Sequence, residues 1–205
     1  MKQTRLSSAT ETPQRPYHHG GVRAAAIEAG LRLLEMSNAE DFSLRAVSRA
    51  IGVSATALYR HFPDKSALLI ALAQEGLDRL ASAQEAASQA SGDGIAGFNA
   101  AGRTYVRFGL EHPALFRMIM THMPAVDHFN DSVDRMPSPM RYLRESVARL
   151  VPSDADAQTQ KALALRCWAM VHGLTMLILD GHVALDDGTL IDQVIDGSDM
   201  WPENA

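Results

Sequence analysis

The chain is organised around residues 43–65, which read SLRAVSRAIGVSATALYRHFPDK. Ser43 is a suitable N-cap, because its hydroxyl can accept a hydrogen bond from a free amide of the first helical turn. Apolar side chains follow at helical spacing and predict one buried face, namely Leu44, Val47 and Ile51. Gly52 supplies the positive φ at which many helices end, and Ser54 caps a second short helix. The segment therefore predicts a helix, a tight turn and a helix, which is the DNA-binding helix-turn-helix pattern.

The second helix, expected to run through His61, predicts an outward surface that suits the major groove of DNA. Its first residues are small, so the helix can approach base edges and place methyl groups against thymine. Tyr59, Arg60 and His61 can donate to phosphate oxygens. Asp64 caps a further helix that opens with Lys65, where free amides and a cation gather. The predicted DNA-binding residues are Ser43, Arg45, Ser54, Ala55, Thr56, Ala57, Tyr59, Arg60, His61 and Lys65. The alternative is a three-helix core with a solvated face, because this geometry also occurs in proteins that bind no DNA.

Two parts of the sequence resemble one protein family. Residues 42–69, FSLRAVSRAIGVSATALYRHFPDKSALL, resemble the N-terminal domain of the TetR family of transcriptional regulators in their Gly-Val turn, their Leu-Tyr-x-His-Phe run and their Asp-Lys-x-x-Leu run. This resemblance covers about residues 22–80. Residues 167–182, CWAMVHGLTMLILDGH, resemble the family's C-terminal ligand-binding and dimerisation domain named for a Trp-His-Gly signature, here Trp168, His172 and Gly173. The resemblance implies a homodimer that represses transcription until a small molecule enters the C-terminal domain.

Composition favours a protein of the cytoplasm that spans no membrane. Of the 205 residues, 46% are hydrophobic and 21% are charged, which is ordinary for a soluble domain. No apolar run approaches the roughly 18–20 residues that cross a bilayer, and the N-terminus has no continuous apolar region typical of a secretory signal. The single cysteine, Cys167, excludes an internal disulfide and suits a reducing compartment.

Charge is divided unevenly along the chain. The net charge is −5, but residues 1–65 carry nine Lys or Arg and six acids, which gives +3, while the remainder carries −8. A basic N-terminal third on an acidic body is what a localised DNA-binding surface requires.

The predicted fold is all-α, with an N-terminal three-helix DNA-binding domain and a C-terminal helical bundle. Residues 1–21 are polar and predict a flexible basic arm, able to reach a minor groove or to remain a solvated tail. Residues 22–65 form the predicted helix-turn-helix domain, and helix four continues from it to about residue 88. The Gly-rich break at 91–94 precedes the predicted ligand-binding and dimerisation domain, residues 89–205. A proline-rich loop is expected at 124–139.

Residues 155–181 predict a helix that is apolar nearly all round between Cys167 and Leu179. Such a helix must be buried on more than one side, so we expect one side to face the domain core and the other a second copy of the chain. Together with a last helix at 190–195 it predicts a four-helix dimer interface. A two-fold dimer places two recognition helices about one DNA turn apart.

The C-terminal part also carries aromatic, methionine and histidine side chains that predict a pocket for an unknown small-molecule effector. The predicted pocket residues are Phe98, Tyr105, Phe108, Met118, His122, Trp168, His172 and Met176. The alternative role of these residues is ordinary core packing, and for His172 a structural hydrogen bond. A second alternative for the whole domain is docking of a protein partner, which predicts a closed core and an exposed apolar patch.

The sequence predicts no enzymatic activity, no cofactor and no metal site. It has no Gly-rich phosphate loop and no nucleophile elbow. Asp180 and His182 lie two residues apart and face opposite sides of a helix, so they cannot close on one ion while the helix continues. The partners that we expect are therefore double-stranded operator DNA, a second copy of the chain and the effector. Activator and repressor use the same DNA contacts, so both remain open at this stage.

Overall fold

The computed structural model describes residues 19–36, 42–92, 94–122, 137–185 and 188–196. Within these ranges the protein is entirely helical, so the all-α prediction is confirmed. Most of the predicted N-terminal arm and most of the predicted loop at 124–139 lie outside the described residues.

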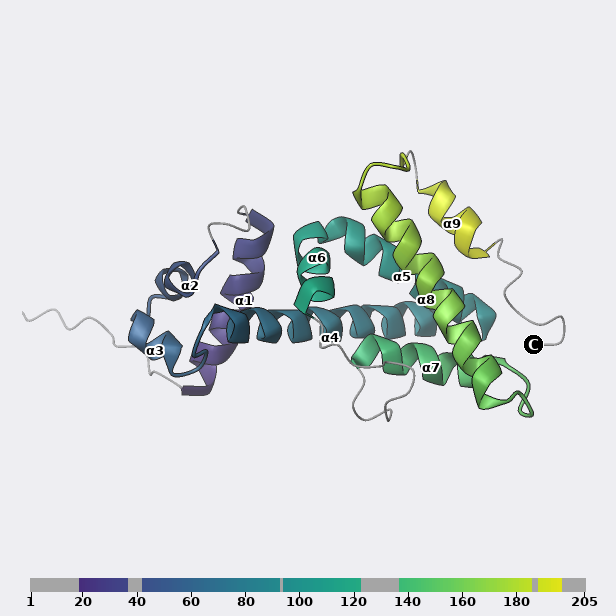
Figure 1. The fold of residues 1–205 in the computed structure, drawn as a ribbon, viewed down its shortest axis with the longest axis horizontal. Helices are drawn as coiled ribbons and strands as arrows, with labels where there is room; N and C mark the ends of the chain where they lie inside the picture. Colours follow the sequence, from purple (N-terminus) through teal and green to yellow (C-terminus); the bar gives the residue numbers. More distant parts are fainter. Residues whose placement is uncertain (1–18, 37–41, 93, 123–136, 186–187, 197–205) are drawn as a thin grey trace, which may run out of the picture.

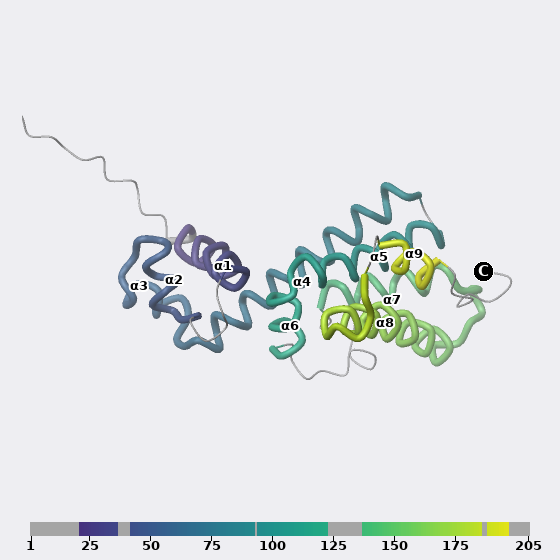
Figure 2. Tube along the Cα trace, turned by 90° about the horizontal axis from the view of Figure 1, so that it is seen from above, coloured from purple at the N-terminus to yellow at the C-terminus, as the bar shows by residue number. Residues whose placement is uncertain are grey.

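The helices form a small N-terminal unit and a larger C-terminal body, joined by one long helix (Figure 1). The N-terminal unit contains α1 (His19–Met36), α2 (Leu44–Ala50) and α3 (Ala55–Tyr59), and α4 (Lys65–Ser91) is the long helix. The body contains α5 (Ile95–Glu111), α6 (Pro113–His122), α7 (Ser138–Leu150), α8 (Ala157–Leu179) and α9 (Thr189–Asp196). Figure 2 shows α4 as a continuous rod that begins beside α3 and ends in the body.

The local signals of the helix-turn-helix are all realised. Ser43 Oγ accepts from the Ala46 amide at 3.2 Å, and Ser54 Oγ accepts from the Ala57 amide at 3.1 Å. Gly52 has φ +71°, the left-handed conformation in which a β-carbon is unfavourable. The differences lie at helix ends: α1 begins three residues before its predicted start, and α3 ends at Tyr59 rather than at His61. Helix ends are the least determined part of a periodicity argument, because terminal turns lack some of their hydrogen bonds.

The core of the N-terminal unit continues into the body without a break. Phe42, Leu58 and Phe62 fill the space between the first three helices, each at most 2% exposed. Leu68 and Leu72 of α4 are fully buried in the same apolar cluster, which extends to Phe116 of α6 and to α8. Burial of one such leucine or phenylalanine contributes about 1.5–3 kcal/mol, so α4 is held at both ends by apolar contacts.

Helix α6 packs against both α4 and α1, and close packing fixes its position. A β-carbon added to Gly76 of α4 would lie 2.8 Å from Ile119 Cδ1 and 3.0 Å from Leu115 Cδ1. A glycine at this position therefore lets α6 approach α4 more closely than any other residue would. The body is thus wedged against the N-terminal unit through α6 as well as joined to it through α4.

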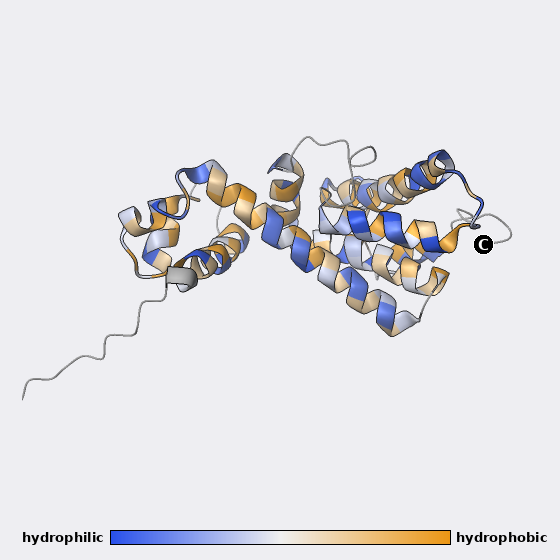
Figure 3. Ribbon diagram, turned by 90° about the horizontal axis from the view of Figure 1, so that it is seen from below, coloured by the Kyte–Doolittle hydropathy of each residue, from blue (hydrophilic) through white to orange (hydrophobic). Residues whose placement is uncertain are grey.

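A second, smaller core lies between α7 and α8. It contains Val147, Val151, Leu163, Ala164 and Cys167, and Phe98 and Leu143 pack against it. Figure 3 shows hydrophobic and hydrophilic segments alternating along the helices, as expected for helices that are buried along one side.

Helix α8 has the composition predicted for it, and its bounds are two residues shorter at each end. By length and composition it is the one helix of the described residues that could cross a membrane, a test that the core helix of a soluble protein also passes. Its inner side packs against α5 and α7, whereas Leu165 and Leu177 on the other side are 49% and 46% exposed.

Candidate nucleic-acid interface and effector cavity

The outward side of α3 carries the side chains that the sequence analysis assigned to DNA. Thr56, Tyr59 and Arg60 are exposed, and Tyr59 is 45% exposed although it is aromatic. Ala55 and Ala57 are half-buried, while Leu58 points into the core. The recognition surface is therefore small-sided at its first turn and polar at its end.

Three cations of the N-terminal unit have no acidic partner within the described ranges, whereas several arginines elsewhere in the chain form ion pairs. Arg45, Arg60 and Lys65 are exposed and form no ion pair with any other described residue. The arginines of the body that face acidic side chains are engaged: Arg79 with Glu28 and Glu75, Arg103 with Asp192 and Asp196, Arg107 with Asp192, and Arg117 with Asp180. The helix-turn-helix thus presents positive charge that is free to meet phosphates.

Two cations of the N-terminal unit, Arg23 and Lys65, lie above aromatic rings of its small core. Lys65 Nζ is 5.8 Å from the centroid of Phe42, and the Arg23 guanidinium is 5.6 Å from the centroid of Phe62. Such contacts contribute about 0.5–1 kcal/mol at exposed sites and hold the charge in place. Arg23 was not among the predicted contacts, because its ring partner lies 39 positions later and periodicity cannot reveal that pairing.

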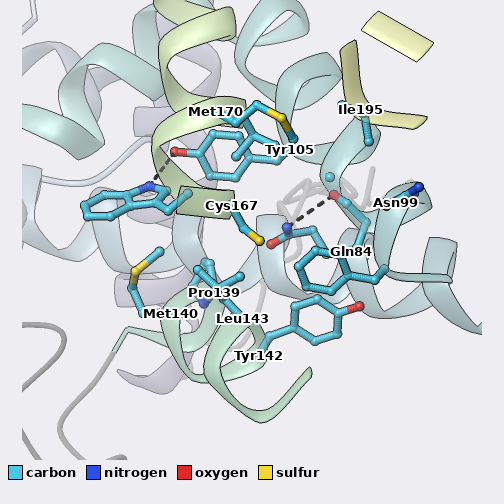
Figure 4. Close-up of a pocket in the computed structure, with 15 residues that line it drawn as sticks. Gln84, Asn99, Tyr105, Pro139, Met140, Tyr142, Leu143, Cys167, Met170 and Ile195 are labelled. Carbon is cyan, nitrogen blue, oxygen red and sulfur yellow. Dashed lines mark hydrogen bonds between the residues drawn. The ribbon is translucent and has the colours of Figure 1, made fainter. Parts of the chain in front are cut away.

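A cavity lies in the body where the two apolar cores fail to merge, between α4, α5, α7, α8 and the end of α9 (Figure 4). It contains about 510 Å³ of space, its open mouth included, and is bounded mainly by aromatic, aliphatic and sulfur-containing side chains. Gly102 of α5 contributes to the opening, because it brings no side chain to that wall. Among the described residues that line it, none carries a formal charge.

One side of the cavity is held by a hydrogen-bonded group of three rings. The Trp168 indole donates to Tyr105 Oη at 3.3 Å, and Tyr105 Oη lies 3.2 Å from His172 Nδ1. Tyr105 Oη accepts from Trp168 and keeps its own hydrogen, which it can donate to Nδ1 of a neutral His172 that is protonated on Nε2. Burial lowers the pKa of His172 and raises the pKa of Tyr105 to about 12, so both groups favour this neutral arrangement.

Sequence models of a single family match both parts of the chain. The model described as bacterial regulatory proteins of the tetR family matches residues 26–72, and the model described as the Tetracyclin repressor-like C-terminal domain matches residues 98–197. The chain belongs to the TetR family of transcriptional regulators. It is therefore a DNA-binding regulator, and its helix-turn-helix is the family's DNA-binding unit.

Solved structures share the TetR fold over most of their length. A protein of unknown function from Rhodococcus sp. RHA1 has a TM-score of 0.68 and 27% sequence identity, over 90% of this chain and 96% of that one. A TetR-family transcriptional regulator from Streptomyces coelicolor has a TM-score of 0.59 and 21% identity, over 87% and 78%. The multidrug binding protein EbrR in complex with imidazole has a TM-score of 0.53 and 19% identity, over 89% and 96%. No curated protein sequence matches the chain as a relative.

The predicted pocket residues of this TetR-family chain divide into two groups. Phe98, Tyr105 and Trp168 line the cavity. Phe108 and Met118 are buried in the main core, and Met176 packs against that core. His122 Nδ1 lies 3.0 Å from the Met118 carbonyl, and His172 is bonded to Tyr105 behind the cavity wall. Phe108, His172 and Met176 share α5 and α8 with the lining residues, so the face of the helix decides which of them reach the cavity. Met118 and His122 lie on α6, which supplies none of the described lining residues.

Gln84 of α4 lines the cavity but is not among the predicted pocket residues. It is 7% exposed, its Nε2 donates to the Ala101 carbonyl at 3.3 Å, and its Oε1 has no hydrogen-bond partner among the described residues. The sequence contains one indication that Gln84 is buried, because Gln84 lies one turn after Leu80 and Ala81 on the apolar stripe of α4. A lone polar residue on such a stripe indicates either a structural hydrogen bond or a ligand contact.

Proposed function

We propose that this protein is a homodimeric repressor that leaves its operator when a small molecule occupies the cavity of the body. The observation that supports this most is the position of the cavity against α4. The same helix begins at Lys65, at the DNA-binding surface, and lines the cavity with Gln84. A ligand that changes the packing around Gln84 acts on the helix that carries the DNA-binding unit.

The DNA contacts of the proposed repressor divide by chemistry. Tyr59, His61 and Lys65 meet phosphates, with Arg45 on the first helix of the motif, and fix the position on the duplex. Ala55, Thr56 and Arg60 face base edges and carry the sequence preference. With alanines at the tip of α3, methyl contacts to thymine outweigh hydrogen-bonded readout.

The dimer forms through the outer side of α8. Small and apolar residues recur there at intervals of three or four, namely Ala162, Leu165, Ala169, Gly173 and Leu177, and all of them except Gly173 are exposed. Gly173 lies on the same line, and a β-carbon placed there would meet nothing within 4 Å. Small residues between leucines let a second helix approach closely, so two α8 helices and two α9 helices make a four-helix interface.

Release follows if the ligand binds better to a dimer whose two DNA-binding units no longer match the half-site spacing. The EbrR structure, which shares this fold and contains imidazole, is consistent with a body that accepts a small molecule. A cavity beside α4, open at its mouth, favours this function over docking of a protein partner, for which a closed body is expected.

The test uses the full chain and an operator fragment recovered by genomic binding selection. Fluorescence anisotropy of that fragment is followed while a compound library is added. The proposal predicts compounds that raise the Kd for the operator by at least about 10-fold, which corresponds to ~1.4 kcal/mol of coupling. A library in which every compound that binds the protein leaves the operator Kd unchanged would reject ligand-controlled release.

A further inference from the structure

The cavity wall presents one unmet hydrogen-bond acceptor. Ala101 O is a carbonyl and can only accept, so the amide atom that faces it at 3.3 Å must be the nitrogen of Gln84. This fixes the orientation of the amide and turns Oε1 away from that contact. Gln84 Oε1 is buried and receives no hydrogen bond from any described residue. Buried acceptors of this kind are uncommon, so the site favours a group that donates.

Two other polar side chains of the wall, Tyr105 and Asn99, are already hydrogen-bonded. Tyr105 Oη accepts from Trp168 and is also hydrogen-bonded to His172. Asn99 Nδ2 donates to Asp196 Oδ1 at 3.1 Å. Among the described lining residues, Gln84 Oε1 is the buried acceptor that has no partner and that a bound molecule can meet (Figure 4).

The walls disfavour charged ligands. No described lining residue is a lysine, arginine, histidine, aspartate or glutamate. Burial raises the pKa of Tyr105 to about 12 and the pKa of Cys167 to about 11, so both lining groups are neutral at pH 7. A carboxylate or an ammonium entering this space would lose its hydration without gaining a counter-charge. The aromatic walls, which include Phe98, Tyr142 and Trp168, suit a flat ring instead.

We infer that the effector is an uncharged, mainly apolar ring compound that donates one hydrogen bond, from a hydroxyl or an N–H group, to Gln84 Oε1. This rests on the proposed ligand-controlled function, since it names the class of molecule that fills the cavity of that function. The donor group explains why a glutamine stands at a position of α4 where neighbouring buried residues are apolar.

The test compares three probes of nearly equal shape by isothermal titration calorimetry without DNA. The probes are 2-naphthol, 2-methoxynaphthalene, which lacks the donor, and 2-naphthoate, which is anionic at pH 7. The proteins are the wild type, Gln84→Met, which keeps the volume but removes the amide, and Gln89→Met, which alters an exposed glutamine of the same helix.

The inference predicts that the wild type and Gln89→Met bind 2-naphthol more tightly than 2-methoxynaphthalene by on the order of 10-fold. Gln84→Met binds the two compounds within about 2-fold of each other and keeps its affinity for 2-methoxynaphthalene, because the apolar walls remain. 2-Naphthoate binds weakest to all three proteins. Retained binding of 2-methoxynaphthalene also verifies that the Gln84→Met variant is folded around the cavity.

Three results would overturn the inference: an equal preference for 2-naphthol in wild type and Gln84→Met, tightest binding of 2-naphthoate, or no binding of any probe up to millimolar concentration. The first result would mean that Gln84 Oε1 accepts a hydrogen bond from a bound water and not from the ligand. Because these titrations contain no DNA, their failure is separate from failure of repression. Gln84-dependent binding of 2-naphthol that leaves the operator Kd unchanged would reject release and retain the ligand class.

Discussion

His112 Nδ1 lies 2.7 Å from Glu35 Oε1, so the corner between α5 and α6 is joined directly to α1 of the DNA-binding unit. The pair is half-exposed, and a second ion pair, between Arg79 of α4 and Glu28, joins α1 to the long helix. Movement in the body therefore reaches the DNA-binding unit through α1 as well as through α4.

The Glu35–His112 contact predicts a measurable coupling. A double-mutant cycle of Glu35→Ala and His112→Ala in urea unfolding should give an interaction of about 0.2–1 kcal/mol, because both side chains are partly solvated. The control cycle pairs Glu28→Ala with His112→Ala. Glu28 lies on α1, as Glu35 does, but it pairs with Arg79 of α4 and not with His112. Additive free energies in the first cycle would mean that the two helices are not coupled through this pair.

The phosphate contacts predict a change in salt dependence. Tyr59→Phe combined with Lys65→Ala should weaken operator binding and lower the slope of log K against log salt by about 0.9 for the lost lysine contact. Arg141→Ala removes an exposed cation of the body and should leave the slope unchanged. Anisotropy titrations at four salt concentrations measure both quantities. An unchanged slope in the double variant would refute the assignment of Lys65 to phosphate.

The proposed dimer face predicts dissociation on a change of charge. Leu165→Glu combined with Leu177→Glu places two carboxylates in the apolar line of α8 and should convert the protein from about twice 22.3 kDa to a single chain. Ile70→Glu is the control, because Ile70 is 51% exposed on α4, away from α8. Sedimentation velocity gives the mass. A variant that keeps the mass of two chains places the interface elsewhere.

The crossing of α5 and α8 predicts intolerance of a single methyl group. A β-carbon at Gly109 would lie 2.5 Å from Thr175 Cγ2, so Gly109→Ala should lower the free energy of unfolding by about 1–3 kcal/mol. Gly102→Ala on the same helix is the matched control. Its β-carbon meets its nearest neighbours at 3.6 Å, so the better helix propensity of alanine should make it neutral or stabilising by up to ~1 kcal/mol. Equal effects of the two changes, followed by urea unfolding, would contradict this packing.

The buried ring group predicts loss of stability in acid. Burial lowers the pKa of His172 below its unfolded value, so the unfolded chain binds the proton more readily. The stability from neutral His172 is present above the unfolded pKa of about 6.5 and is lost as the pH falls below it. His172→Asn should flatten this decline between pH 7 and pH 5, whereas His182→Asn, at an exposed site, should not. Parallel urea midpoints for wild type and His172→Asn over this range would argue against the neutral arrangement.

Local signals in the sequence predicted the helix-turn-helix well, because its caps, its glycine turn and its apolar spacing act within a few residues of one another. Ser43, Gly52 and Ser54 have the roles that their chemistry predicts. The long helix from Lys65 and the apolar helix α8 were predicted for the same reason.

The cavity was harder to predict, because its position depends on how helices distant in sequence cross. His172 and Trp168 share a helix face, yet Trp168 lines the space and His172 lies behind Tyr105. Gln84 is not among the predicted pocket residues because a lone polar residue among alanines does not by itself indicate burial. Its burial arises from α5, which begins after the Gly-rich turn. Its missing partner is visible only when the whole wall is assembled.

The most direct measurement of the central claim is footprinting, with stoichiometry, on a genomic fragment selected by the full chain. The account predicts a two-fold symmetric site whose half-sites lie about 34–36 Å apart or a multiple of this distance, bound by two chains and lost in the Tyr59→Phe, Lys65→Ala variant. Binding that shows no fragment preference over random DNA at moderate salt, or one chain on an asymmetric site, would contradict it.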